Sequence, residues 1–296
     1  MNDLVNVLIV GVLLGGIYSL VSIGLNLIFG VIRIVNFAQG EFVMLGMYAA
    51  FAAFSFLHLN PYLAAFIVCP VLFLFGILVQ RFILQPLQNE PMMQVFATFG
   101  LLILLQNVVL AITGGASLSV RIDLASVTIP FGTMQVSVVR LIALVASTLV
   151  AISLQLFLNH TLQGKAIRAV AQDRRAARLM GINVESTYMI TFGIGTALTG
   201  LAGALLAPIY TLQPQIGGNF IVAAFAVVVL GGLGSVLGAY IGGFIVGITE
   251  AFAGFYLDPA LKHAVWFMVF IVMLIIRPSG MFGHIGAEEV GLREQD

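Results

Sequence analysis

The sequence predicts an all-α fold: a polytopic transmembrane helical bundle of eight or nine spans. Hydrophobic residues make up 61% of the 296 residues and charged residues only 8%, whereas ordinary soluble domains contain about 25% charged residues. Apolar runs of the length that crosses a bilayer as a helix, about 20 residues, recur along the chain. These runs are too long and unbroken for the strands of a membrane barrel, so we expect a single transmembrane domain over residues 1–296.

Eight apolar runs account for the expected spans, and one of them is ambiguous. The stretch from Phe220 to Thr249 is too long for one span and short for two spans with a loop. Gly231, Gly232, Gly234 and Ser235 interrupt it, so either two short helices meet there or one half is re-entrant. The runs are Leu4–Phe29, Phe42–Leu59, Tyr62–Gln80, Gln94–Thr113, Val138–Leu158, Thr187–Ile209, Phe220–Thr249 and Leu261–Ile276.

The orientation of the bundle follows from the basic residues in its loops. Five of the twelve Lys and Arg residues lie in segment 160–186, and short loops rich in Lys and Arg stay in the cytoplasm. Counting spans backward from this segment places the N-terminus outside. The start of the chain carries Asp3 and no basic region, so we interpret it as the first span and not as a cleaved signal. Nine crossings also place Arg277 and Arg293 inside, which favours nine.

Glycines recur within the spans at the spacing of helix-packing motifs. The pairs Gly11/Gly15, Gly238/Gly242 and Gly243/Gly247 each follow a small-xxx-small pattern, which lets two membrane helices approach closely. We expect most of them to lie at helix–helix contacts.

Polar residues interrupt an apolar neighbourhood where the second span begins. Asn36, Gln39 and Glu41 surround Gly40 there, and ionisable groups at membrane depth usually face a bundle interior or a wet cavity. One interpretation is a bend that lines a solute path. The other is an interfacial loop in which Glu41 occupies a helix N-terminus, where the helix dipole favours an anion.

The basic segment contains the second polar motif. Its alanine-rich stretch from Ala166 to Met180 predicts a short helix, and Gly181 is a natural residue to end it. Such a helix has a small-residue face that a partner protein could approach, with a basic face beside it. The alternative is an anchor that lies on anionic lipid headgroups.

The sequence offers no catalytic residues, no metal site and no nucleic-acid-binding charge. The phosphate-binding loop, zinc-protease and nucleophile-elbow motifs are all absent. The single cysteine, Cys69, lies in an apolar run, and no two of the four histidines have the spacing of helical metal ligands. Twelve basic residues balance twelve acidic ones, so no strong field attracts nucleic acid. We expect a protein that is not an enzyme.

Over most of its length the sequence resembles the permease subunits of branched-chain amino acid ABC importers, more closely the first of the two paired permease types. The resemblance runs from about Gly15 to Gly280, and the order and spacing of its motifs make it strong. The motifs are Asn36-Phe-Ala-Gln39-Gly40-Glu41, Leu104-Leu-Gln106-Asn107, Gly164 through Asn183, Val229-Leu-Gly231-Gly232-Leu-Gly234-Ser235, Gly238-Ala-Tyr-Ile-Gly242-Gly243 and Arg277-Pro-Ser-Gly280.

This resemblance implies partners, location and residue roles. Such a permease lies in the bacterial cytoplasmic (inner) membrane and pairs with a homologous second permease. Two cytoplasmic ATPase subunits hydrolyse ATP, an extracytoplasmic substrate-binding protein delivers the solute, and the permease itself carries no cofactor. Segment 160–186 corresponds to the loop that couples to an ATPase, with Gly164, Arg168, Ala169, Asp173, Ala177, Gly181 and Ile182. The resemblance also suggests a translocation path or gate with Asn36, Gln39, Glu41, Gln106, Asn107, Gly231, Gly232, Gly234 and Ser235.

Other functions stay open at this point. Related importers carry urea or short-chain amides. A self-sufficient secondary transporter or channel would need ion coupling, for which membrane-depth charges are few, and it would leave the basic segment without a role. A structural membrane scaffold predicts no solute flux.

Overall fold

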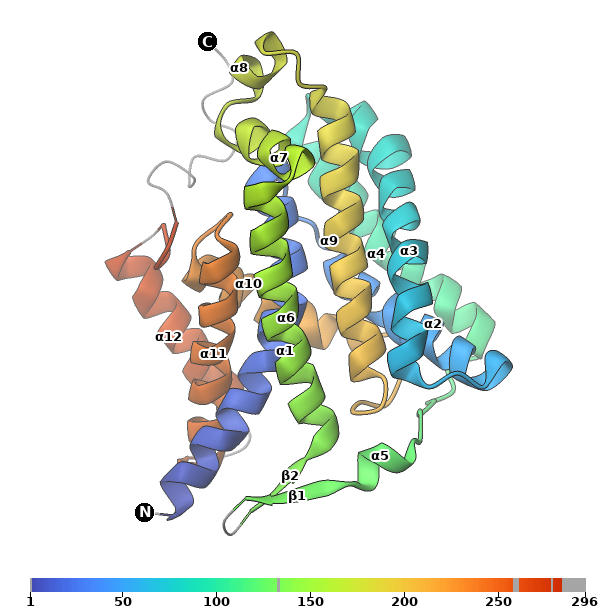
Figure 1. The fold of residues 1–296 in the computed structure, drawn as a ribbon, viewed down its shortest axis with the longest axis vertical. Helices are drawn as coiled ribbons and strands as arrows, with labels where there is room; N and C mark the ends of the chain where they lie inside the picture. Colours follow the sequence, from blue (N-terminus) through green and yellow to red (C-terminus); the bar gives the residue numbers. More distant parts are fainter. Residues whose placement is uncertain (1, 132–133, 258–260, 278, 284–296) are drawn as a thin grey trace.

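The computed structural model describes residues 2–131, 134–257, 261–277 and 279–283; Arg293 lies outside them. It is a helical bundle with two small helices at one end and a β-hairpin at the other (Figure 1). The elements are α1 (Asn2–Ile32), α2 (Gln39–Leu57), α3 (Pro61–Val79), a π turn (Gln80–Leu84), a 3-10 turn (Gln85–Leu87), α4 (Pro91–Thr113), α5 (Asp123–Ser126), β1 (Thr128–Phe131), β2 (Met134–Ser137), α6 (Val138–His160), α7 (Leu162–Gln172), α8 (Arg174–Leu179), α9 (Val184–Leu206), α10 (Ile216–Gly231), α11 (Val236–Tyr256) and α12 (Lys262–Ile276).

The predicted membrane bundle is confirmed. Seven helices are long and apolar enough to cross a bilayer, and two shorter apolar helices, Ile216–Gly231 and Ala264–Ile276, accompany them within the described residues. The ambiguous stretch is two helices, because α10 ends at Gly231 and α11 begins at Val236. Gly232 and Gly234 make the turn between them with φ of 106° and 84°, a conformation that glycine adopts without steric cost.

The predicted glycine contacts lie chiefly between α1 and α11. A Cβ atom on Gly15 would lie 2.7 Å from the Cα atom of Phe244, and one on Gly247 would collide with Gly15 itself. The backbones of the two helices therefore touch, as the small-xxx-small spacing predicts.

Two non-helical segments enter the bundle from opposite ends. We call the end of the bundle with α7 and α8 the cytoplasmic end, as the sequence predicts, and the end with the hairpin the outer end. Residues 33–38 follow the cytoplasmic end of α1, and residues 207–215 follow the outer end of α9 (Figure 1). Gln39, where α2 begins, donates a hydrogen bond to Thr199 of α9, and Gly24 of α1 packs against the same threonine. At 1.5 Å per residue this level is about 12 Å from the end of α1 and about 10 Å from the end of α9.

The first turns of α2 and α10 meet at this level in the middle of the bundle. A Cβ atom on Gly217 would lie 2.6 Å from the carbonyl oxygen of Gly40. From here α10 runs to the cytoplasmic end, where Gly234 packs against Gly30, and α2 runs to the outer end (Figure 1). We call the contact of Gly40, Glu41 and Gly217 the α2–α10 junction.

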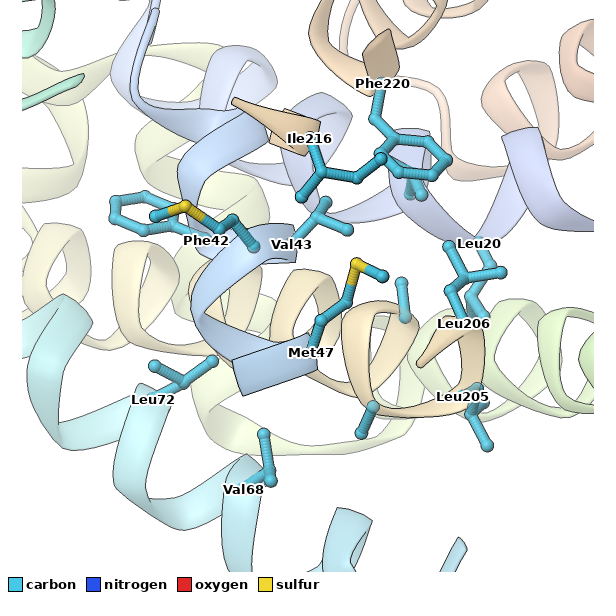
Figure 2. Close-up of a cluster of buried hydrophobic side chains, with 14 of the residues drawn as sticks. Leu20, Phe42, Val43, Met47, Val68, Leu72, Leu205, Leu206, Ile216 and Phe220 are labelled. Atoms are coloured by element: carbon cyan, nitrogen blue, oxygen red, sulfur yellow. The ribbon is translucent and has the colours of Figure 1, made fainter. Parts of the chain in front are cut away.

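The main hydrophobic core surrounds this junction and holds it in place. Figure 2 shows its side chains converging from α1, α2, α3, α9 and α10. Phe42 and Met47 of α2 and Leu206 of α9 are fully buried, and Ile216 and Phe220 cover them from α10. The start of α2 is therefore embedded in apolar packing, as is the side of α10 that carries Ile216, Gly217 and Phe220.

The single helix predicted from Ala166 to Met180 is wrong, because α7 and α8 are separate. Asp173 lies between them with an extended backbone, and its carboxylate accepts the N–H groups of Arg175 and Ala176 at 2.7 and 2.9 Å. This side chain caps α8 and so starts a new helix. The outer hairpin, in which Thr128 pairs with Ser137, and the short α5 beside it were not predicted either.

Candidate functional site

A network of buried amides holds the start of α2. Asn36 accepts the N–H of Ala38 at 3.1 Å and donates to the side chain of Gln39 at 3.0 Å. Gln39 in turn donates to Thr199 of α9. All three polar side chains are buried, so the network satisfies groups that lipid or apolar packing would leave unpaired. The structure brings Asn36 and Gln39 together, as their shared motif suggests.

Glu41 lies in the first turn of α2 at the α2–α10 junction. It is 1% exposed, and its Oε1 accepts a hydrogen bond from Gln106 of α4 at 2.9 Å. Its Oε2 has no hydrogen-bond partner among the described residues. A Cβ atom on Gly217 would lie 2.8 Å from Oε1, so the carboxylate also faces the start of α10. Two helix N-termini, each with partial positive charge, thus meet one carboxylate inside the bundle.

This geometry combines the two interpretations left open by the sequence. Glu41 does occupy a helix N-terminus, but that N-terminus lies at mid-depth and not in an interfacial loop. Non-helical backbone at membrane depth is tolerated only where protein buries it or where it lines a cavity. Gln106 reaches this site. Its neighbour Asn107 does not, because it is exposed on α4 and donates to the carbonyl of Ile103 at 2.8 Å.

The glycine–serine turn predicted for the same path lies elsewhere. Asn26 of α1 accepts the N–H of Gly234 at 2.7 Å and donates to the carbonyl of Ser235. Gly231 packs against Gly238, and Gly232 against Gly283. The turn is therefore clamped against α1 where α10 ends and α11 begins, about 21 Å from the α2–α10 junction by the length of α10 between Gly217 and Gly231.

Sequence analysis missed three buried polar side chains that the structure places at contacts. Asn26 and Thr199 each lie inside an apolar run. A single polar residue within a span was the sequence signal that could have identified them. Glu250 of α11 accepts a hydrogen bond from Tyr18 at 2.6 Å and is 5% exposed. It was missed because the predicted span stopped at Thr249, whereas α11 continues to Tyr256.

At the cytoplasmic end, part of the small-residue face of the basic segment is turned inward. Gly164, Ile167 and Ala177 are buried; a Cβ atom on Gly164 would collide with Leu158 of α6. The chain's own helices therefore cover Gly164 and Ala177, so a partner protein would contact the exposed remainder of the segment, which includes Ala176. Ala169 and Ile182 are half-buried, while Arg168, Asp173 and Gly181 are exposed.

The end of α8 has the predicted glycine. Gly181 has φ of 83° and donates to the carbonyl of Arg178 at 3.1 Å, and Ile182 donates to that of Ala177 at 3.0 Å. This pair of bonds is the Schellman motif. Within it, Leu179 and Met180 are 88% and 82% exposed. A helix end that presents two large apolar side chains away from the bundle suits contact with another protein.

A groove of about 640 Å³ lies beside α8. Its walls are Gln88, Asn89, Arg174, Arg175, Arg178, Gly181, Ile182, Asn183, Val184 and Glu185.

The carboxylate that caps α8 is charged at neutral pH. Backbone hydrogen bonds from Ala176 and Arg175 hold the pKa of Asp173, at the start of α8, below its ordinary value.

Comparison with known proteins identifies the family. The family described as "Branched-chain amino acid transport system / permease component" matches residues 7–275. The chain belongs to this permease family. It is a multi-pass protein of the inner membrane and a permease of an ABC transport system.

Several curated relatives of the family match almost end to end. The high-affinity branched-chain amino acid transport system permease protein LivH of Salmonella typhimurium is 31% identical, over 95% of this chain and 96% of its own. The corresponding protein BraD of Pseudomonas aeruginosa is 32% identical, over 96% and 97%. The ribose import permease protein RbsC of Escherichia coli matches a shorter stretch, 35% identical over 31% of each chain. No solved structure matches.

Proposed function

We propose that this chain is one membrane permease of an ATP-driven importer for branched-chain amino acids. A homologous second permease completes the translocation path, two cytoplasmic ATPase subunits supply the energy, and an extracytoplasmic binding protein delivers the solute. The near full-length similarity to LivH and BraD, whose names state branched-chain amino acid transport, supports the solute class. The single domain of residues 1–296 provides the path, and segment 160–186 provides the coupling.

The main support for the coupling role is the way in which α7 and α8 are attached to the bundle. Ile167 and Val170 are buried in one cluster with residues of α1, α6 and α9. Arg33, at the end of α1, donates to the carbonyl of Ala171 at 3.2 Å. A force applied to the exposed end of α8 is therefore transmitted to the ends of three membrane helices. Packed helices move as rigid units, so an ATPase that closes against α8 changes access to the path.

The α2–α10 junction is the part of the path that such a movement would open. Glu41, Gln39, Asn36 and Gln106 form its polar centre, where a solute with charged ends finds a carboxylate and two helix N-termini. The Gly231–Ser235 turn, held by Asn26, is the cytoplasmic hinge of α10 and α11 in this proposal.

Charge reversal on α7 tests the coupling assignment. In the complete transporter reconstituted in liposomes, Arg168→Glu should lower ATP-driven leucine uptake by about tenfold or more, equivalent to roughly 1.4 kcal/mol of lost contact energy. Arg81→Glu is the matched control, because Arg81 is also exposed but belongs to the turn after α3. Normal uptake by the Arg168 variant, with the ATPase subunits still bound, would refute the role of α7. Urea and acetamide as competitors distinguish the alternative solutes.

A further inference from the structure

Two exposed amide side chains, one on α4 and one on α10, have hydrogen-bonding groups that no described residue pairs. Asn107 is exposed on α4, and its only hydrogen bond in the described structure is the one that its Nδ2 donates to its own helix. Asn219 is exposed in the first turn of α10, and its side chain has no hydrogen bond to any described residue. Both lie next to the α2–α10 junction, since Gln106 and Gly217 contact Glu41.

The depth of these amides makes contact with lipid unfavourable. The junction lies at mid-depth, and a polar group left unpaired in hydrocarbon costs several kcal/mol. Other membrane faces of the same chain differ. The exposed side chains of α3 between Leu63 and Leu78 are all apolar, as a lipid-facing surface requires. On α4 and α10 the exposed side chains are likewise apolar except for Asn107 and Asn219. These two positions are therefore the ones that lipid does not suit.

Aromatic contacts join the two helices into one surface. The ring of Phe37, in the segment before α2, lies 6.3 Å from the ring of Phe99 on α4 and 5.9 Å from that of Phe225 on α10. Beside them Gly100 and Gly218 are exposed, and a Cβ atom on either glycine would meet open space. We call the surface formed by Phe99, Gly100, Asn107, Gly218, Asn219 and Phe225 the α4–α10 face.

The chemistry of this face fits one class of solute. Its aromatic rings offer apolar contact to an aliphatic side chain, and its two amides offer hydrogen bonds to an ammonium or a carboxylate group. Glu41, whose Oε2 has no partner among the described residues, is bonded through its Oε1 to Gln106, the sequence neighbour of Asn107. A zwitterionic α-amino acid with a branched aliphatic side chain has both kinds of group.

We propose that the α4–α10 face is this chain's wall of the solute passage, wetted in the working transporter, with Asn107 and Asn219 binding the polar end of the amino acid. This inference rests on the proposed function and adds to it the residues that contact the solute. The second permease closes the opposite side of the passage.

Cysteine accessibility tests whether the face is wet. In a Cys69→Ala background, Asn219→Cys and Asn107→Cys are compared with Leu74→Cys, which is 60% exposed on the apolar face of α3. A charged, membrane-impermeant thiol reagent is added to the complete transporter in nanodiscs. Only a hydrated thiolate reacts with the reagent. The cysteines at positions 107 and 219 should therefore be labelled at least about tenfold faster than the cysteine at position 74. Saturating leucine should slow that labelling.

A second pair of variants measures solute contact directly. Asn107→Leu and Asn219→Leu should raise the KM for leucine about two- to tenfold, the effect of one lost hydrogen bond, with an unchanged melting temperature. A lipid-facing role predicts the opposite, namely a higher melting temperature and an unchanged KM.

The outcomes separate this inference from the proposed function. Labelling no faster than at position 74 in every nucleotide state, in a transporter that still imports leucine, would overturn the wall assignment and leave the importer role standing. Absence of leucine import by the unmodified transporter would overturn the importer role. If Asn219→Cys fails to assemble, Gly218→Cys reports on the same turn.

Discussion

The close contact of two helix starts can be tested with a pair of adjacent glycines. In Gly217→Ala the new methyl group would lie 2.6 Å from the carbonyl oxygen of Gly40 and 2.8 Å from Oε1 of Glu41. In Gly218→Ala it would meet open space. Both substitutions gain the same helix propensity, about 1 kcal/mol, whereas overpacking costs about 1–3 kcal/mol. The free energies of unfolding of the two variants should therefore differ by about 1–3 kcal/mol, and Gly217→Ala should be the less stable variant.

The assay is thermal unfolding of the purified chain in detergent, followed by binding of a thiol-reactive dye to Cys69 as it becomes exposed. Gly218→Ala should melt at or above the temperature of the unmodified protein, and Gly217→Ala below it. Equal melting temperatures for the two variants would show that α2 and α10 do not touch at this point, and the α2–α10 junction would have to be abandoned.

Three further predictions concern the cytoplasmic end. Gly181→Ala forces an L-residue into the left-handed region at a cost of about 1–2 kcal/mol, so amide exchange at Ile182 should accelerate; unchanged exchange would contradict the Schellman cap. Because hydrogen bonds lower the pKa of Asp173, its stabilisation of α8 is complete above the ordinary Asp pKa and is lost as the pH falls through the lowered pKa. Exchange in α8 should therefore rise in that acidic range, and a similar rise in Asp173→Asn would argue against the cap. Asn26→Leu leaves the N–H of Gly234 and the carbonyl of Ser235 unpaired, which lowers the free energy of unfolding by about 1–3 kcal/mol for each group. The variant should therefore melt at a lower temperature, and a melting temperature equal to that of the unmodified protein would disprove the clamp.

Much of the fold follows from the sequence because membrane helices depend on apolar length, which is a local property. The spans and the break at Gly231–Ser235 could be predicted on that basis, and glycine spacing predicted helix–helix contacts without showing that α1 and α11 make them. The break after Gln172 could not, because an alanine-rich stretch favours one helix and only the capping geometry of Asp173 divides it.

The candidate site was less accessible to sequence reasoning because it is assembled from distant segments. Asn36 and Gln39 are neighbours in sequence, but their partner Thr199 belongs to α9, more than 150 residues away. The position of Gly217 against Gly40 depends on segment 207–215 turning back into the bundle, which no local pattern indicates. Motif order also grouped Ser235 with Glu41, although the structure places them near opposite ends of α10, about 21 Å apart along that helix.

ATP-driven uptake in liposomes tests the central claim most directly, that this chain is a gate moved by separate ATPase subunits. The complete transporter with its binding protein should accumulate leucine only when ATP is supplied to the cytoplasmic side of the membrane. The chain reconstituted alone should not accumulate leucine under a proton or sodium gradient. Accumulation by the isolated chain on an ion gradient would contradict the account.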